Sequence, residues 1–401
     1  MHLKSRSKPY IIPEYSLTGD LLSFLTCNLQ YRYQNKGTLP PSMPIQLWFG
    51  EFIHGVMEEA YLKWEEEKLE FPWQWDKDIR PIEEMIDQRL SSRGLFPPSK
   101  QYCPEHFPEE KIGVYEFGDN PYARIASARA ERSINVWGPY LFPLIDSSEI
   151  RLKGIRDMPN YDKKHSRSNH YSVNGVIDVL SSFKINNSTQ RTIDSYQNTI
   201  VQYLQNDKSF RETLKNKIDN EYEVIIDYKG MRRPSTDSET YKQHEWQILT
   251  YSWLREQQKD AKPIAAGIVF YLNELVPSII DLKLIKEDIV NGKTDVKISK
   301  KDKESLLEWD GNENYYPTLS DKFRLDRSIR IIPIRKDKIE SSLKEFDSVV
   351  NQIESSLIKE QEGIKIGDAW KAEAEQRTCD ACDFKTICQK NKGNIENFTV
   401  P

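Results

Sequence analysis

Two acidic residues and a lysine stand at the ends of apolar segments. Residues 174–178 read Asn-Gly-Val-Ile-Asp, and residues 224–229 read Val-Ile-Ile-Asp-Tyr-Lys. Runs of Val and Ile bounded by Gly or polar residues predict strands, and ionised side chains at the ends of buried strands are rarely tolerated unless they are paired or hold a metal. Two carboxylates beside an ammonium group form an oxygen-rich site for a divalent cation. That chemistry suits metal-assisted attack on a phosphodiester.

Asp227 and Lys229 are separated by one residue, so their side chains project from the same face of a strand. A lysine in this position could orient a water molecule and stabilise developing negative charge. The structural alternative is that the Asp caps the next turn and the Lys only pairs with it. An isolated Asp-x-Lys sequence is usually structural, and the second acidic strand, ending at Asp178, favours the catalytic interpretation.

Three further side chains could complete such a site. A helix is predicted from Pro44 onwards, and His54 on its flank could be a third metal ligand as a neutral imidazole. Most lone histidines on apolar helices are structural, however. Gln247 and Tyr251 lie four residues apart in a helix predicted around 239–257, so they share a face. That face could line the catalytic cleft, or it could be an ordinary helix–sheet contact.

The five cysteines are unevenly placed. An odd number argues against a disulfide framework, and Cys379, Cys382 and Cys388 form a C-x2-C-x5-C group that favours a metal centre. With Cys27 the group has four thiolates, which suit either Zn²⁺ or a 4Fe–4S cluster. Spacing does not choose between them. Cys27 is selected because the C-terminal group needs a fourth ligand, whereas Cys103 reads as an isolated thiol.

Composition excludes few functions. The net charge of −5 gives no sign of a general nucleic-acid binder, but local clusters decide such binding. Arg232 and Arg233, just after Lys229, could hold phosphates, whereas the basic residues at 163–167 are more consistent with solvated surface. No apolar stretch approaches the roughly 18 residues of a membrane helix. The N-terminus lacks the apolar core of a signal peptide, so we expect a cytoplasmic protein.

Strands predicted on either side of a helix favour an α/β fold. The strand segments are 149–152, 171–180, 223–228 and 265–272, with a further apolar run at 329–334. We expect five regions: N-terminal helices with the first cysteine and His54 (1–64), a mainly helical insertion (65–148), the core (149–275, with a mobile insertion at 184–222), an additional α/β segment and long helix (276–360), and a cysteine-rich tail (361–401).

In this order, the motifs resemble those of the PD-(D/E)xK nucleases of the RecB type. The resemblance rests on His54, the strand ending at Asp178, the Ile-Ile-Asp-Tyr-Lys strand ending at Lys229, and the Gln247–Tyr251 helix. The flanking cysteines are similar to the iron–sulfur subset, which includes the AddB nuclease and the CRISPR-adaptation exonucleases. Together these motifs span less than a third of the chain. The implied fold is a restriction-endonuclease-like core, a central mixed sheet flanked by helices, with a helical insertion and a C-terminal Fe–S cap.

The resemblance also implies a role for each residue. Mg²⁺ or Mn²⁺ would be bound by His54, Asp178, Asp227 and the carbonyl of Tyr228, and Lys229 would be the catalytic lysine. Gln247 and Tyr251 would contact DNA and support the site. Glu149 matches only loosely an acidic position on the first core strand. The 4Fe–4S cluster, implied in preference to Zn²⁺, would join the two chain ends through four ligands: Cys27, Cys379, Cys382 and Cys388.

Two departures from compact members of this family concern geometry. The insertion at 65–148 is large, and 49 positions separate the two acidic residues where a short hairpin would be expected. Neither departure removes a catalytic residue. We therefore expect a metal-dependent deoxyribonuclease, an exonuclease or end-processing enzyme of DNA repair, recombination or CRISPR and phage defence. The alternative is a non-catalytic, cluster-stabilised DNA-binding or scaffold subunit of a helicase–nuclease complex. Expected partners are single-stranded DNA or DNA ends, with a helicase or defence protein, and no membrane.

Overall fold

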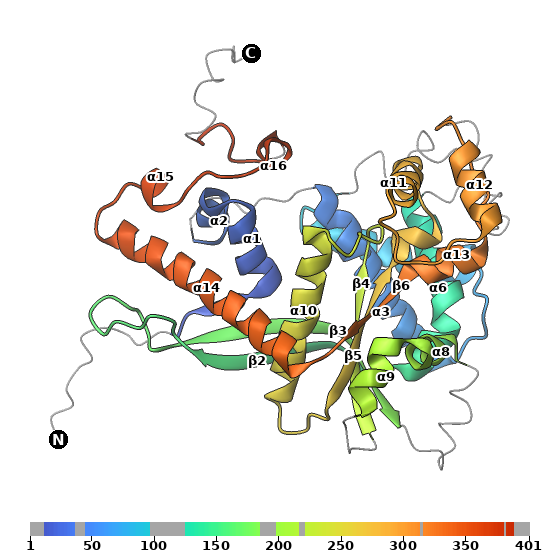
Figure 1. Cartoon of the computed structure of the whole chain (residues 1–401), viewed down its shortest axis with the longest axis horizontal. Helices are drawn as coiled ribbons and strands as arrows, with labels where there is room; N and C mark the ends of the chain where they lie inside the picture. The colour runs from blue at the N-terminus through green and yellow to red at the C-terminus, as the bar shows by residue number, and fades with distance from the viewer. Residues whose placement is uncertain are drawn as a thin grey trace.

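A central mixed sheet flanked by helices forms the body of the protein, as the sequence predicted (Figure 1). Its strands are β1 (Glu14–Ser16), β2 (Ser147–Asp157), β3 (His170–Lys184), β4 (Glu221–Lys229), β5 (Ile264–Tyr271) and β6 (Ile329–Pro333). The computed structural model describes residues 12–36, 45–96, 125–184, 198–215, 221–312, 316–380 and 382–388. Cys103 and parts of the predicted insertions, at 97–124, 185–197 and 216–220, lie outside these ranges.

The helices surround this sheet on both faces. The longer ones are α3 (Ile45–Glu67), α4 (Arg80–Ser92), α6 (Ile125–Leu141), α10 (Glu239–Glu256), α11 (Ile279–Val290) and α14 (Lys336–Gln361). Shorter ones are α1 (Ser23–Thr26), α2 (Asn28–Asn35), α8 (Thr199–Asn206), α9 (Lys208–Lys215), α12 (Lys300–Glu308), α13 (Asp321–Ser328), α15 (Ile366–Ala369) and α16 (Gln376–Asp380). Single turns are η1 (Leu17–Leu22), η2 (Trp75–Ile79), η6 (Phe142–Leu144) and η7 (Leu272–Leu275). None of these described helices is long and apolar enough to cross a membrane.

The strands follow the order β1-β3-β4-β5-β6, with β2 paired to β3. Because β2 runs antiparallel along residues 170–180 of β3, it occupies one whole edge of that strand. The other edge is shared: β1 pairs in parallel with residues 172–174, and β4 pairs antiparallel with residues 179–184. A gap is therefore left on this edge between the two partners, and it ends at Asp178.

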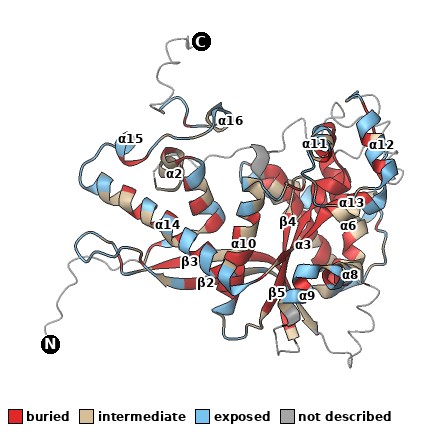
Figure 2. Ribbon diagram, viewed as in Figure 1, coloured by how far each residue is buried: buried red, intermediate tan, exposed pale blue. Residues whose placement is uncertain are grey.

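The sheet separates two hydrophobic cores. On β4, Val224 and Ile226 face the core built with α3, α4 and α6, whereas Ile225 faces the core built with α10 and α14. This alternation is expected of a strand that is buried on both faces. Figure 2 shows β4 and β5 buried along their length, while the outer helices α12 and α16 are largely exposed. The sheet ends carrying the acidic residues are thus fixed from both sides.

Helix α10 lies close against the sheet because glycines face it. A Cβ on Gly267 of β5 would come within 2.2 Å of Ile248, and one on Gly175 of β3 would come within 2.7 Å of Tyr251. Any larger residue at these points would push the helix outwards. The glycines therefore set the distance at which α10 presents its polar side chains to the strand ends.

The two ends of the described chain pack together. The backbone N–H of Leu29 donates to the carbonyl of Lys371 at 3.2 Å, and Arg32 makes a two-pronged ion pair with Glu360 of α14 at 2.6 and 2.7 Å. Trp370, fully buried, lies edge-on to Phe24 of α1. These contacts bring α1 and α2 beside the segment that follows α14 (Figure 1).

Candidate metal and active site

Asp178 and Asp227 meet where β3 and β4 separate. The ladder ends with the pair Val179 and Ile226, so the two acids occupy the next position in register. The backbone N–H of Tyr228 donates to Asp178 Oδ2 at 2.8 Å. A carboxylate thus replaces the carbonyl that would continue the ladder, and both acids are held at its end.

Strand β3 twists at Asp178. Residues i and i+2 of a regular strand share a face, yet Ile177 belongs to the core under α10 and Val179 to the core under α3. Opposite Asp178 in the β2 ladder lies Glu149, whose φ is +51°, in the left-handed region. The irregular pair directs both carboxylates towards α3.

His54 reaches this pair from α3. Its Nδ1 lies 3.3 Å from Asp178 Oδ2, and its ring stands edge-on to Tyr228 with centroids 5.9 Å apart. A Cβ on Gly230 would come within 2.8 Å of Phe49, so this glycine allows α3 to approach the end of β4. The predicted association of His54 with Asp178 is present.

Glu149 completes a group of three ligands. One ligand atom from each of His54, Glu149 and Asp178 lies within 4.8 Å of the others, and the described residues form no other such group. The sequence had offered Glu149 only as a loose match on the first core strand, because its position depends on the β2–β3 register. Asp227, predicted as a ligand, lies outside this closest group. The predicted role of the Tyr228 carbonyl stays a prediction.

Asp227 belongs to a hydrogen-bonded set with α10. Lys229 Nζ lies 2.6 Å from Asp227 Oδ2 and donates to Gln247 Oε1 at 2.8 Å. The amide Nε2 of Gln247 lies 3.1 Å from Asp227 Oδ1 and 3.0 Å from the hydroxyl of Tyr251. All four predicted residues are therefore in contact, and the helix holds the lysine ammonium between an acid and an amide.

The acids differ in their electrostatic surroundings. Burial would raise the pKa of Asp178, but His54, Lys229 and the Tyr228 N–H together hold it below its usual value. Burial and the neighbouring Asp178 raise the pKa of Asp227 despite the attraction of Lys229. Local desolvation and the carboxylates of Asp178 and Glu58 raise the pKa of Glu149 to about 7. Negative charge in this site is thus only partly compensated.

A divalent cation fits these residues. Carboxylate oxygens are the ligands that Mg²⁺ and Mn²⁺ prefer, and imidazole also suits the softer transition metals. The raised pKa values of Asp227 and Glu149 arise partly from repulsion by the carboxylate of Asp178, which bound positive charge would relieve. His54, Glu149 and Asp178 are placed to hold the ion directly, with Asp227 beside them.

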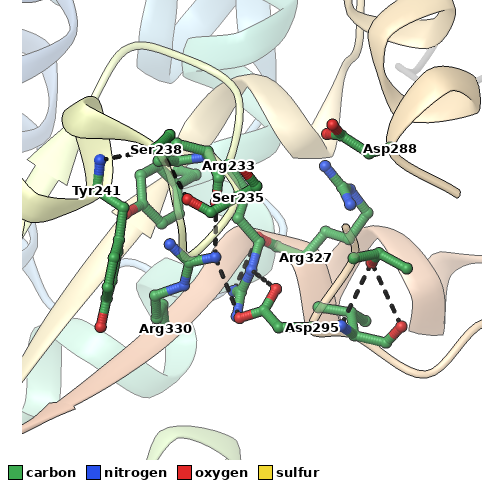
Figure 3. A network of polar contacts seen from close by, with 12 residues as sticks. Arg233, Ser235, Ser238, Tyr241, Asp288, Asp295, Arg327 and Arg330 are labelled. Atoms are coloured by element: carbon green, nitrogen blue, oxygen red, sulfur yellow. Dashed lines mark hydrogen bonds and ion pairs between the residues drawn. The ribbon is translucent and has the colours of Figure 1, made fainter. Parts of the chain in front are cut away.

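The two arginines after Lys229, which the sequence suggested could hold phosphates, both have acidic partners. Arg232 pairs with Asp288 at 2.7 Å. Arg233 is buried, makes a two-pronged contact with Asp295 at 2.5 and 2.8 Å, and donates to the backbone carbonyl of Ile329 at the start of β6 (Figure 3). Arg330 of β6 also reaches Asp295, at 3.0 Å. These contacts fasten the chain that follows the active-site strand.

Four cysteines line a single cavity where the chain ends meet. Cys27 is buried between α1 and α2 in extended conformation, and Cys379, Cys382 and Cys388 are half-buried. All four face one pocket beside Tyr33 and Phe384, and all are free thiols. The pKa of Cys382 is raised, mainly by burial and to a smaller extent by the neighbouring thiols of Cys27 and Cys388. The predicted meeting of the four cysteines is present.

Comparison with known proteins points to one superfamily. A family model described as the PD-(D/E)XK nuclease superfamily matches residues 214–389. The match includes Asp227, Lys229, Gln247 and Tyr251 and continues through the cysteine tail, whereas His54, Glu149 and Asp178 precede it. No curated protein matches the chain. The similarity indicates a metal-dependent nuclease.

Proposed function

We propose, from this similarity and the geometry of the site, that the protein is a deoxyribonuclease that hydrolyses DNA from ends. One observation carries the proposal most directly: the group of His54, Glu149 and Asp178 lies beside a lysine held by Asp227 and Gln247. Metal ligands next to a positioned cation are the parts that phosphodiester hydrolysis needs.

Each residue has a distinct role in this proposal. His54, Glu149 and Asp178, with Asp227, would hold Mg²⁺ or Mn²⁺, which activates water and neutralises charge on the phosphate. Lys229 orients the attacking water and stabilises the negative charge on the phosphoryl oxygens. Gln247 fixes the lysine, and Tyr251 fixes Gln247 through its hydroxyl.

The test is cleavage of end-labelled DNA by purified protein with Mg²⁺ or Mn²⁺. Lys229→Ala should reduce kcat by about 10²–10³-fold, the usual effect of removing a group that stabilises transition-state charge. The control is Lys300→Ala on α12, because Lys300 is exposed and pairs only loosely with Glu304 at 3.7 Å. Full activity of Lys229→Ala would contradict the assignment. Tight DNA binding without cleavage in any divalent metal would favour the scaffold alternative.

For the cysteines we propose a 4Fe–4S cluster. In a tetrahedral zinc site with Zn–S near 2.3 Å, sulfurs lie only about 3.8 Å apart. Among the described residues no three cysteine sulfurs lie within 4.8 Å of one another, and the four surround a cavity instead. That wider arrangement suits a polynuclear centre. Iron and acid-labile sulfide with visible absorbance would support the cluster, whereas stoichiometric zinc in colourless protein would refute it.

The resemblance also predicts a partner and a pathway. The partner would be a helicase or a CRISPR or other defence component, and the pathway would be DNA repair or recombination. Both stay predictions.

A further inference from the structure

One face of the β2–β3 ladder is not covered by α10. The glycines that contact this helix, Gly154 and Gly175, face one side of the ladder. On the other side Arg151 and Lys153 are exposed, and Ile155 is 59% exposed. The sheet therefore offers an open surface that begins at the metal-ligand group.

A groove runs over this surface. It is lined by Arg151 and Lys153 of β2, Asn174 of β3, Ser16 of β1 and Thr18 of η1. It also reaches Tyr251, which contacts Gln247 in the active site. The groove thus joins the catalytic residues to a polar surface outside the site.

The cations in the groove follow the strand direction away from the metal ligands. Arg151 and Lys153 lie two and four residues beyond Glu149, or about 7 and 14 Å along β2. Their ladder partners are Val176 and Asn174, two and four residues before Asp178. These steps are comparable to the distance between successive phosphates of an extended polynucleotide.

The two basic side chains in the groove differ in whether they already have an acidic partner. In the described part of the chain, the side chain of Arg151 has no ion pair or hydrogen bond. Lys153 pairs with Glu14, and Glu14 also accepts from Asn174 Nδ2 at 3.1 Å. Arg151 is therefore available to a phosphate, whereas Lys153 is available only when Glu14 releases it.

We propose that this groove, the strand track of Arg151, Lys153, Asn174, Ser16 and Thr18, binds the backbone of one DNA strand leading to the active site. Arg151 contacts the phosphate one nucleotide from the reacting one, and Lys153 contacts the next. Glu14 weakens the second contact. The inference rests on the proposed nuclease function for its substrate, and it adds the path by which that substrate lies on the protein.

The occupant is a single strand because the two cations form one line. A duplex would bring a second row of phosphates over the same ladder, and the next exposed groups along β2 are apolar Ile155 and acidic Asp157, which is 92% exposed. Hydroxyl and amide groups at Ser16, Thr18 and Asn174 suit hydrogen bonds to phosphate or sugar. Such a track gives affinity without reading sequence.

The test measures binding of a fluorescent ten-nucleotide DNA strand without divalent metal, over a range of salt concentrations. Each lost phosphate contact should reduce the slope of log K against log salt by about 0.7 for a single strand. Arg151→Ala should therefore lower the slope by about 0.7 and weaken binding roughly tenfold. Adding Lys153→Ala should bring the loss of slope to between about 0.7 and 1.4, because Glu14 already takes up part of the charge of Lys153.

Glu14→Gln supplies a change in the opposite direction. It keeps an acceptor for Asn174 but releases Lys153, so the strand should bind more tightly and the slope should increase. A merely structural effect would not strengthen binding. The matched control is Arg335→Ala, because Arg335 is exposed, pairs loosely with Asp337 at 3.7 Å and lies before α14. It should leave affinity and slope unchanged.

Equal slopes for the unmodified protein and Arg151→Ala would overturn the strand track, even if the protein cleaves DNA. If the variants lose slope as predicted but the protein cleaves DNA with no metal ion tested, the strand track would stand and the nuclease function would be overturned. If Arg151→Ala lowers the slope equally for a blunt duplex, the assignment to one strand is wrong. Tighter binding of an RNA strand with the same loss of slope would overturn the assignment to DNA.

Discussion

The carboxylate of Asp178 takes part in both the sheet and the site. It accepts the N–H of Tyr228, which continues the β3–β4 pairing, and it contacts His54. Replacement by Ala would remove a proposed metal ligand and also leave a buried N–H without its acceptor, which costs about 1–3 kcal/mol. Asn is therefore the informative replacement, since it keeps an acceptor for Tyr228 while removing the charge.

Glu149 provides a test of the metal site that avoids this double role. Glu149→Gln removes one of three clustered ligands, so Mn²⁺ affinity should fall by at least the ~10–100-fold that loss of an outer-shell partner causes. Calorimetric titration of Mn²⁺ measures this directly. The control is Glu59→Gln on α3, where the acid pairs with Arg89 at 2.7 Å. Equal affinities for Glu149→Gln and the unmodified protein would exclude Glu149 as a ligand.

His244 on α10 should make stability depend on pH. Burial, with Lys229 and Arg330 nearby, lowers its pKa to about 3, and Nδ1 lies 3.1 Å from the hydroxyl of Tyr271. Between pH 6.5 and 3 the unfolded chain binds a proton there that the folded protein does not, so stability falls as pH decreases.

The size of that effect can be isolated with His244→Phe, which keeps a ring but does not titrate. From pH 7 to pH 5 the unmodified protein should lose about 2 kcal/mol more free energy of unfolding than the variant. Urea unfolding at the two pH values measures the difference. Identical losses would show that His244 is not buried in neutral form.

Sequence patterns identified most of the site residues but not their grouping. Asp178, Asp227 and Lys229 are visible because charge at the end of an apolar run is unusual. Glu149 stands in a polar stretch, and only the β2–β3 register and its positive φ bring it to His54. Arg232 and Arg233 follow Lys229 closely in sequence, yet both have acidic partners more than 50 residues away. Whether such a residue belongs to the site depends on its partners far away in the sequence, and composition does not show these.

At the scale of elements, the position of α10 depends on the glycines of the sheet strands that face it. The strand predictions succeeded where Val and Ile runs were continuous, as in β3, β4 and β5. β1 has three residues, and its extended form follows from pairing with β3 rather than from its own sequence. The break between α1 and α2 at Cys27 was also not predicted, because one residue with φ of −165° leaves the helical pattern on both sides intact.

The contact between Gly175 and Tyr251 links stability to activity. Gly175→Ala would place its Cβ 2.7 Å from Tyr251 and 2.9 Å from Leu254. We expect a loss of about 1–3 kcal/mol in the free energy of unfolding, with a lower kcat because Tyr251 and Gln247 must shift. Urea unfolding and DNA cleavage measure the two effects.

Gly50→Ala is the matched control, since nothing lies within 4 Å of its Cβ position and it lies inside α3, one turn before His54. Alanine should stabilise the helix by about 0.5–1 kcal/mol. Activity should be unchanged. A stable and fully active Gly175→Ala protein would show that α10 tolerates a wider separation from the sheet.

At the scale of the whole molecule, the four cysteines are held by packing as well as by sequence. Arg32, Glu360 and Trp370 form a connected set, because the indole N–H of Trp370 also donates to Glu360 at 2.8 Å. The metal-ligand group at Asp178 shares no residue with this set. Loss of the proposed cluster should therefore loosen the chain ends before it affects the metal ligands.

Cys27→Ser tests this separation. The variant should lose most of its iron and visible absorbance, and its N-terminal segment should become sensitive to protease, while Mn²⁺ affinity stays within a few-fold of the unmodified protein. Cys103→Ser is the control, since that thiol is not assigned to the cluster, and it should keep its iron. Iron content unchanged in Cys27→Ser would remove Cys27 from the ligand set.

The meeting of the chain ends also has a consequence for biosynthesis. Phe24, Cys27 and Tyr31 are made some 350 residues before Trp370 and the residues around Cys379 that cover them. At 5–20 residues per second this interval is roughly 20–70 s. During it Phe24 and Cys27 lack the contacts that Trp370 and the C-terminal cysteines supply. These contacts thus form only after residue 370 has been made, and a nascent chain stalled before it cannot complete them.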